Sequence, residues 1–355
     1  MLKIGDKIND RYKLVNFIAH GGMGEVWKCF DESLKRNVAV KFVKGLNYVQ
    51  SPKAEKILAD EASTGANLIG HPNILTILDY DSFEYGSQKI YFIVMELLEG
   101  KNLNEWIKEF KSTLESRTYY SISLLIAWEL CKSIDFAHKK GIIHRDIKPL
   151  NVFISDFGIT KVGDFGLAKF VDEMTRTHSV WQAKSIPYSA PEQWKNEKST
   201  EQTDLYQLGC TIYELFTGEL PFSGNTLYAQ MNAHLYEEPK SPKEKNNEIS
   251  DDLAKAILKL LSKEEDDRGS VWEINDVIAQ ELQATYKVEI KIANEPKELI
   301  EKVCKIGDFD YNSLSEDRGN YTFPDFNEVL AEGIQLSFLI PDKIRIYKKE
   351  EIVTT

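Results

Sequence analysis

Cysteine is scarce in this sequence, with four residues in a chain of 355. Cys29, Cys131, Cys210 and Cys304 lie far apart, and no two of them have the C-x-x-C spacing of a zinc or redox site. Disulfide frameworks belong mainly to small secreted domains, so this scarcity argues against that class of protein. We therefore expect reduced thiols and a cytoplasmic location.

Long apolar runs and an excess of positive charge are also lacking. No run approaches the roughly eighteen residues of a membrane-spanning helix, and residues 1–6 lack the apolar core of a signal peptide. The chain has 44 Lys and Arg against 56 Asp and Glu, a net charge of -12. This balance argues against nucleic acid or an anionic membrane as the main partner. We expect a soluble protein that binds neither.

The most informative stretch is the sequence HRDIKPLN at residues 144–151, followed by DFG at residues 164–166. Its acid Asp146 can orient a substrate hydroxyl, and Lys148 can neutralise a phosphate. The amide of Asn151 and the carboxylate of Asp164 are oxygen ligands of the kind that Mg²⁺ prefers. An ordinary charged loop would rarely match so many fixed identities, so the stretch predicts phosphoryl transfer.

This stretch resembles the catalytic loop and metal-binding motif of eukaryotic-like, Hanks-type Ser/Thr protein kinases, H-R-D-L-x-x-x-N and D-F-G. The resemblance covers about residues 10–282, and its motifs look most like those of bacterial Ser/Thr kinases. It implies an α+β protein with the bilobal kinase fold, a small β-rich N-lobe at residues 1–98 and a large helical C-lobe at residues 99–285. It also implies ATP and Mg²⁺ as cofactors and protein Ser/Thr hydroxyls as acceptors. The implied catalytic residues are Asp146 and Lys148, and the implied metal ligands are Asn151 and Asp164.

A second DFG triplet, at residues 156–158, follows Asn151 too soon to leave room for two strands and a turn. We expect residues 151–154 and 159–162 to form a short hairpin with residues 155–158 as its turn. Asp156 is then a decoy, and Asp164 is the metal ligand.

A glycine-rich segment connects two expected strands at residues 11–18 and 25–30. Glycines let the backbone approach phosphate oxygens, although a glycine-rich hairpin by itself is more often only a turn. In the family pattern its first glycine is replaced here by Ala19, for which we predict a negative φ. The resemblance implies that the nucleotide contacts Ile18, Ala19, His20, Gly21, Gly22, Met23, Gly24 and Val26.

Lys41 ends the apolar sequence VAVK at residues 38–41. A lone lysine at a strand end is usually just solvated. By resemblance, however, Lys41 is a catalytic residue that holds the α- and β-phosphates and pairs with an acid on the next helix. The best candidate for that acid is Glu61, with Glu55 as the alternative.

Residues 74–80 and 89–95 read as two more strands, and residues 96–100 as the hinge between the lobes. By resemblance, Met95 is the gatekeeper, Glu96 begins the adenine-binding hinge, and Leu98 supplies the hinge N–H. The residues that would sandwich the adenine ring, which could equally serve the core alone, are Ile18, Val26, Ala39 and Phe153.

In the large lobe we expect helices at residues 119–138, 253–261 and 271–282. By resemblance, Asp204 anchors the catalytic loop and Arg268 pairs with Glu192. Residues 169–184 are the implied activation loop. A phosphate there could pair with Arg145, so we predict autophosphorylation at Thr177 and Ser179 first, with Thr175 ranked behind them.

Residues 286–355 read as a separate small α+β module. Strands are expected at residues 287–292, 333–340 and 343–347, and a helix at residues 296–304. The module resembles no family that we recognise. It either docks on the large lobe or binds a partner, and the sequence does not rank these alternatives.

Two other classes of function compete with a protein kinase. A pseudokinase scaffold would use the fold only for binding, but intact Lys41, Asp146, Asn151 and Asp164 speak against it. A small-molecule phosphotransferase would share these acids but would not need the sequence APE at residues 190–192 or an activation loop with hydroxyl side chains.

Overall fold

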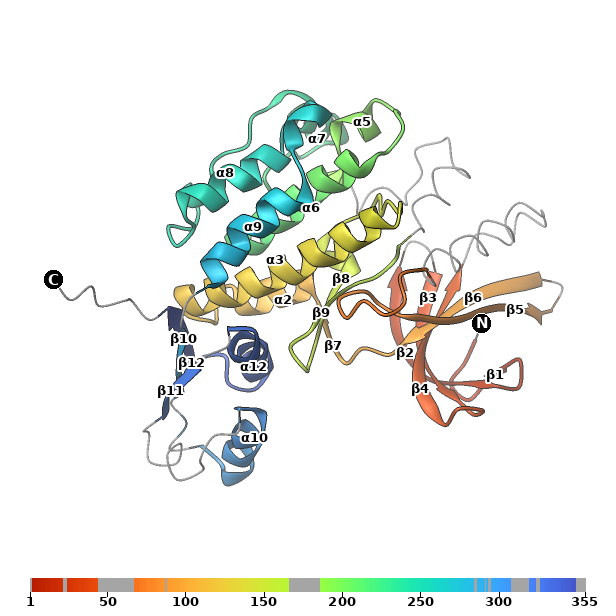
Figure 1. The fold of residues 1–355 in the computed structure, drawn as a ribbon. Helices are drawn as coiled ribbons and strands as arrows, with labels where there is room; N and C mark the ends of the chain where they lie inside the picture. The colour runs from red at the N-terminus through yellow and green to blue at the C-terminus, as the bar shows by residue number, and fades with distance from the viewer. Residues whose placement is uncertain are drawn as a thin grey trace.

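The structure is a computed structural model, which describes residues 2–21, 24–43, 67–86, 88–165, 186–283, 286–290, 292, 295–307, 319–323 and 326–348. An antiparallel sheet forms the small lobe and helices form the large lobe, with a further α+β unit beyond residue 285 (Figure 1). The bilobal α+β fold expected from the sequence is confirmed.

The small-lobe sheet has the strand order β1-β2-β3-β4-β6-β5. The expected strands at residues 11–18, 25–30, 74–80 and 89–95 all lie within it, although β5 is shifted toward the C-terminus of the expected range. The strands are β1 (Lys7–Ile8), β2 (Tyr12–Gly21), β3 (Gly24–Asp31), β4 (Arg36–Val43), β5 (Ile77–Tyr85) and β6 (Gln88–Glu96).

Alternation along β4 gives this sheet two different faces. Val38, Val40 and Phe42 point into an apolar cluster that also contains Trp27 from β3. Ala39 and Lys41 must therefore point to the opposite face, because successive strand residues alternate. The sheet thus buries one face as its own core and turns the Lys41 face toward the large lobe.

The helices of the large lobe match the expected ranges closely. The two longest, α3 (Ser116–Lys139) and α6 (Glu201–Thr217), pack against each other in the middle of the lobe (Figure 1). The others are α2 (Leu103–Phe110), α5 (Pro191–Trp194), α7 (Leu227–Tyr236), α8 (Asp251–Leu260) and α9 (Val271–Leu282), with short 3-10 turns η2 (Pro149–Asn151), η4 (Ile186–Tyr188), η5 (Pro242–Glu244) and η6 (Glu265–Arg268).

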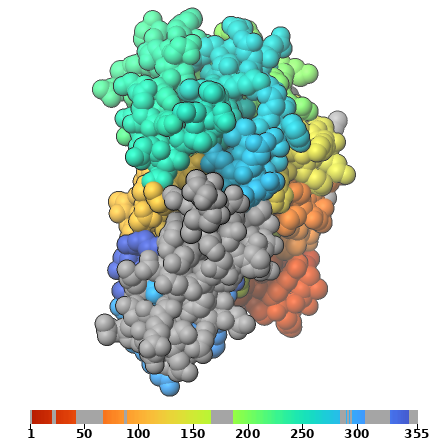
Figure 2. All heavy atoms as spheres, turned by 60° about the vertical axis from the view of Figure 1, so that its left-hand side comes forward, coloured from red at the N-terminus to blue at the C-terminus, as the bar shows by residue number. Residues whose placement is uncertain are grey.

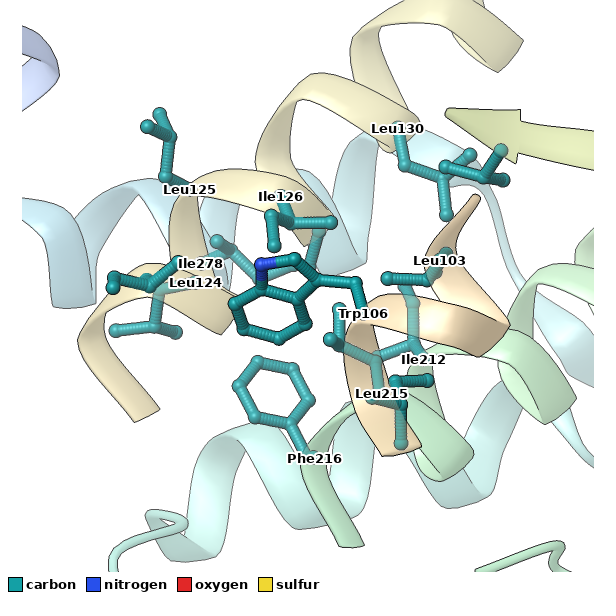
Figure 3. Close-up of a cluster of buried hydrophobic side chains, with 14 of the residues drawn as sticks. Leu103, Trp106, Leu124, Leu125, Ile126, Leu130, Ile212, Leu215, Phe216 and Ile278 are labelled. Carbon is teal, nitrogen blue, oxygen red and sulfur yellow. The ribbon is translucent and has the colours of Figure 1, made fainter. Parts of the chain in front are cut away.

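Trp106 of α2 lies at the centre of the large-lobe core (Figure 3). Its indole stacks on the Tyr119 ring, with centroids 5.1 Å apart. Around it, Figure 3 shows side chains of α3 and α6, including Leu124 and Phe216. Burying such large apolar groups contributes roughly 1.5–3 kcal/mol per side chain, which fixes α3 and α6 as the frame for the loops between them.

A small sheet of β7 (Gly100–Asn102), β8 (Val152–Ser155) and β9 (Thr160–Val162) lies between the lobes. Strands β8 and β9 are paired, and Gly158 in their turn has a φ of +76°. The hairpin expected around the second DFG triplet is therefore confirmed. It places Asp156 in an exposed turn and leads β9 directly toward Asp164.

The C-terminal unit consists of β10 (Tyr286–Ile290), α10 (Lys297–Gly307), β11 (Gly319–Phe323), α12 (Phe326–Leu339) and β12 (Ile344–Lys348). Its apolar residues belong to the same core as those of the large lobe. The Phe338 ring meets the Phe110 ring edge-on at 5.4 Å, and Ile346 N donates to Thr118 Oγ1 at 2.7 Å. Figure 2 shows the unit's dark blue residues beside the amber residues of the large lobe. Of the two alternatives for this unit, docking on the large lobe is what the structure shows.

The expected strand at residues 333–340 is wrong, because these residues belong mostly to helix α12. The apolar residues Ile334, Leu336 and Ile340 alternate as in a strand, but the buried set also includes Leu330 and Ser337, which follow helical spacing. A short apolar run does not separate the two periods. Strand β11 was not expected, whereas the strands at 287–292 and 343–347 and the helix at 296–304 are confirmed in position.

Among the described residues, no helix combines the length and the apolar character needed to cross a membrane.

Candidate active site

The catalytic-loop backbone is held by a buried acid from helix α6. Asp204 Oδ2 accepts the N–H of His144 at 2.7 Å, and its Oδ1 accepts the N–H of Arg145 at 2.6 Å. His138, in the last turn of α3, approaches the same carboxylate at 2.8 Å. Arg145 has a φ of +70°, a conformation that a non-glycine residue adopts only at a cost. The expected anchoring role of Asp204 is confirmed, and it stabilises a strained turn just before Asp146.

Two side chains of the catalytic loop, those of Lys148 and Asn151, contact the Asp146 carboxylate. Lys148 Nζ lies 2.5 Å from Asp146 Oδ2, and Asn151 Nδ2 donates to the same oxygen at 3.1 Å. Asn151 Nδ2 also donates to Asp146 O at 2.8 Å. These bonds fix the amide orientation and leave Asn151 Oδ1 without a hydrogen bond from any described residue.

Residues 163–165 are fixed against the catalytic loop by His144. Its Nε2 lies 2.9 Å from Gly163 O, and its ring lies 4.5 Å from the Phe165 ring. Asp164 has a φ of +62°, so the chain turns sharply at this residue. The turn brings the Asp164 carboxylate back toward the small lobe, whereas Asp156 stays in its exposed hairpin turn.

Lys41 of the small lobe reaches Asp164 across the cleft. Its Nζ lies 2.8 Å from both Oδ1 and Oδ2 of Asp164. Burial disfavours the charged form of Asp164, but the charge and hydrogen bond of Lys41 more than offset this and hold the pKa of Asp164 below its usual value of 3.8. Asp164 is therefore an ionised carboxylate at neutral pH, as a metal ligand must be.

The apolar residues expected around the nucleotide share the sheet face of Lys41. Strand register places Val26 opposite Lys41, and Ala39 opposite Met95. Ala39 and Met95 are buried, and Ile18 is about half exposed at the cleft. Phe153, on β8, packs close to Gly163, beside Asp164. The result is a set of apolar side chains beside a charged cluster.

The hinge and the glycine-rich segment are described in part. Residues 97–99 lie outside any helix or strand, and the backbone of Leu98 makes no hydrogen bond to any residue that the structure describes. Glu96 is held by Thr76 N and by Lys161 Nζ, each 2.8 Å from its Oε1.

In the glycine-rich segment, Ala19 and His20 lie in β2, and the φ of Ala19 is not positive, as predicted. Gly21 and Gly24 face each other where β2 and β3 join.

Several expected site residues lie outside the described part of the chain. These are Gly22, Met23, Glu55, Glu61, Gly166, Thr175, Thr177 and Ser179.

Sequence reasoning missed three polar residues that support the loop: His138, Gln193 and Gln207. A signal did exist for Gln207, because it follows Asp204 by three positions and so lies on the same face of α6. Gln193 carries no comparable signal, since only the tertiary fold brings it to the loop.

The residues present fit a Mg²⁺–nucleotide complex. No group of three or more His, Cys, Asp and Glu side chains within the described residues is arranged as a self-sufficient metal site. Mg²⁺, however, is usually bound by one or two carboxylates together with substrate phosphates and water. The side-chain carbonyl oxygen of Asn151, which bonds to no described residue, and the ionised Asp164 would supply protein ligands of that kind, and Lys41 would supply a positive charge for phosphate.

A β-sheet lobe that carries a lysine, joined to a helical lobe that carries an Asp–Lys–Asn loop and a second acid, is an arrangement of the kind found in the protein kinase fold. The sequence profile of the protein kinase domain matches residues 12–287, and the chain belongs to this family.

Curated relatives agree with this assignment. The chain is 36% identical over 261 residues to a probable serine/threonine-protein kinase of Clostridium perfringens, a match that covers 74% of this chain and 36% of that protein. It is 34% identical over 261 residues to the serine/threonine-protein kinase PrkC of Bacillus subtilis, covering 74% of this chain and 39% of PrkC. The chain thus spans well under half the length of the curated relatives that it matches.

Among solved structures, a single-substitution variant of the PknI kinase domain from Mycobacterium tuberculosis superposes with a TM-score of 0.60 at 21% identity. The match covers 79% of this chain and 98% of that one, and it shows that the two share a fold.

Proposed function

We propose that the chain is an ATP- and Mg²⁺-dependent protein kinase that transfers the γ-phosphoryl group of ATP to serine and threonine hydroxyls of proteins. The observation that carries this proposal is the closeness of two charged groups, Asp146 with Lys148 and Asn151, and Asp164 with Lys41, with the charge of Lys148 acting on Asp164. The relatives named as serine/threonine kinases support the same acceptor class.

Each residue has a role that follows from its charge and position. Asp146 orients the acceptor hydroxyl and accepts its proton, and Lys148 stabilises negative charge on the phosphoryl group. Asn151 and Asp164 would hold Mg²⁺, which when bound neutralises charge on the phosphates. Lys41 and the glycine-rich segment position the phosphates, with Glu61 as the proposed partner that orients Lys41.

The adenine would lie between Ile18, Val26 and Ala39 on one side and Phe153 on the other. Leu98 N–H would donate to the ring, with Met95 and Glu96 at the start of the hinge. The backbone of Leu98 bonds to no described residue, which supports this role, since a hinge donor must be available to a ligand.

We also propose regulation by autophosphorylation at Thr177 and Ser179, with Thr175 ranked behind them. Arg145 is the candidate partner for the phosphate, because an arginine beside the catalytic acid can pair with its two negative charges. The activity is proposed for the cytoplasm, where ATP is available and where the four free cysteines would stay reduced.

We divide the chain into a small lobe at residues 1–98, a large lobe at 99–285 and a C-terminal module at 286–355. The apolar cluster of the small-lobe sheet, separate from the core of the large lobe, supports the first boundary. The module packs against the large lobe through the same apolar core.

Intact mass after incubation with ATP and Mg²⁺ tests the proposal. The wild-type chain should gain phosphate stepwise, and Asp146→Asn should slow this by about 10²–10⁴-fold through loss of the base. The two DFG acids provide a matched pair: Asp164→Asn should abolish the gain, whereas Asp156→Asn should leave it intact.

Two results would contradict this assignment. If Asp156→Asn abolished phosphorylation and Asp164→Asn did not, the metal ligand would be wrongly assigned. If the wild type bound Mg²⁺–ATP yet transferred phosphate neither to itself nor to a protein substrate, a binding scaffold would replace the kinase.

A further inference from the structure

Two polar side chains of α6 hold the backbone on both sides of Asp146. Asp204 bonds to the N–H groups of His144 and Arg145, as described above. Gln207, one turn further along α6, bonds to the next groups: its Oε1 accepts the N–H of Ile147 at 2.8 Å, and its Nε2 donates to Arg145 O at 2.9 Å. The Gln207 side chain therefore connects the residue before Asp146 with the residue after it.

The Gln207 amide is buried, with 2% of the residue exposed. Its orientation is determined, because Ile147 N–H can only donate and Arg145 O can only accept. Losing the amide would leave a buried N–H without an acceptor, and such a group disfavours the conformation that contains it. Since Arg145 is already strained at a φ of +70°, the loop depends on these bonds to keep Asp146 in place.

Gln193 extends this contact to another part of the chain. Its Oε1 accepts Gln207 Nε2 at 2.9 Å and the N–H of Ala190 at 3.0 Å, and its Nε2 donates to Arg145 O at 3.3 Å. Ala190 follows closely on η4, the short turn at the end of the implied activation loop. A continuous path of hydrogen bonds thus runs from Ala190 through the two glutamines to Ile147.

We propose that Gln207 and Gln193 are positioning residues, which set the orientation of Asp146 and couple it to the backbone at residues 186–190. Neither glutamine is among the residues assigned to ATP, metal or acceptor, so both act through the catalytic loop. The inference rests on the proposed kinase function and deepens it. A displacement of residues 186–190 would move Gln193, change the bonds on Arg145 O and shift Asp146.

Steady-state kinetics of the full chain tests the positioning role. Gln207→Met and Gln193→Met keep the side-chain length and remove the amides. Because a displacement of about 1 Å can cost about 10²-fold in rate, we expect kcat on a Ser/Thr peptide to fall by about 10- to 100-fold in Gln207→Met and less in Gln193→Met. KM for ATP should not change, and the double variant should lose less than the product of the two single losses.

Thr211→Val is the matched control. Thr211 Oγ1 donates to Gln207 O at 2.9 Å within α6, and Thr211 is equally buried, so the variant loses a buried hydrogen bond of the same helix without touching the catalytic loop. It should keep wild-type kcat. Circular dichroism at the assay temperature confirms which variants are folded. If Gln207→Met does not fold, Gln193→Met, at the partly exposed end of the path, tests the positioning role in its place.

Hydrogen exchange read by mass spectrometry gives a result independent of activity. The peptide that contains residues 144–147 should exchange faster in Gln193→Met than in the wild type or Thr211→Val. If exchange there is unchanged, or if kcat of the folded Gln207→Met equals that of Thr211→Val, the coupling is refuted. If the wild type transfers no phosphate at all, the kinase assignment fails, and exchange alone then decides whether the glutamines hold the loop.

Discussion

The buried ion pair between Arg268 and Glu192 should be among the most costly contacts to break in this chain. Arg268 Nη1 and Nη2 donate to the two Glu192 oxygens at 2.8 and 2.9 Å, and the two side chains are 0% and 2% exposed. Arg268 also donates to the backbone oxygens of Ser262, Gln202 and Lys263. The predicted pairing is confirmed, and Arg268→Met would remove every one of these bonds together.

The magnitude follows from the charge that is left behind. Without Arg268, Glu192 keeps only the Thr203 hydroxyl, 2.7 Å from its Oε1, as a side-chain donor among the described residues. Breaking one side of a buried pair costs about 3–5 kcal/mol, because the remaining charge is buried without compensation. Methionine retains much of the apolar volume of arginine, so the loss of stability measures the unpaired charge of Glu192 more than a change in packing. We expect the free energy of unfolding to fall by that amount at pH 7.

The pH dependence gives the sign of the effect. Burial disfavours the charged form of Glu192, but the Arg268 hydrogen bonds and charge more than offset it and lower the pKa of Glu192 below 4.5. A lowered folded-state pKa contributes stability that is present above the unfolded pKa and is lost as pH falls through the folded pKa. In Arg268→Met the pKa should instead rise. The difference between wild type and variant should therefore be largest near neutral pH and shrink below pH 4.5.

Urea denaturation followed by circular dichroism, at pH 7 and pH 4, measures both quantities. Lys243→Met is the control, because Lys243 pairs with Asp251 in an exposed contact, and such pairs contribute little. It should change neither value measurably. A loss below about 1 kcal/mol for Arg268→Met at pH 7, or a loss that grows as the pH falls, would refute the reasoning.

Three further changes probe other contacts. Gly158→Ala should lower the free energy of unfolding by more than the 1–2 kcal/mol or so that a positive φ costs, because the added Cβ would lie 2.2 Å from Ala331 O. Gly141 has a similar φ with open space around it, so Gly141→Ala should cost only that conformational term. Urea denaturation of the two variants measures the difference. Lys41→Met should weaken Mg²⁺–ATP binding and phosphate gain while leaving the far-ultraviolet spectrum unchanged, as calorimetric titration and intact mass would show. Asp204→Ala should cost roughly 2–6 kcal/mol, since it leaves the buried N–H of His144 and the partly buried N–H of Arg145 without an acceptor. An unfolding curve equal to that of the wild type would contradict this.

Local sequence patterns predicted those parts of the site that depend on neighbours in the chain. The spacing between Asn151 and the two DFG triplets was enough to separate Asp156 from Asp164, because a hairpin needs a minimum number of residues. Strand alternation, which places Ala39 and Lys41 on one face of β4, is a constraint of the same local kind. Such short-range constraints do not depend on how the lobes pack.

Other parts could not be predicted, because they depend on contacts between distant segments. Lys41 was expected to pair with Glu61, and the described residues show it paired with Asp164, which lies 123 positions away in the sequence. The amide path through Gln193 exists only once α5 packs beside α6. Helix α12 was misassigned because its core face includes Gly333, which fits there through its close approach to Ile346, a contact that no sequence period reveals.

The two sets of proposed catalytic groups are supported by different cores, and this determines how they can move. Asp146, Lys148 and Asn151 bond to one another and, through the loop backbone, to buried residues of α6, so they form one rigid set. Lys41 lies on a sheet whose apolar cluster is separate from that of the large lobe. Its ion pair with Asp164, together with that of Glu96 and Lys161, spans the boundary between them. A shift of the sheet would therefore change the distance from Lys41 to Asp164 without disturbing the set around Asp146, so nucleotide positioning can vary while the acceptor side of the site stays fixed.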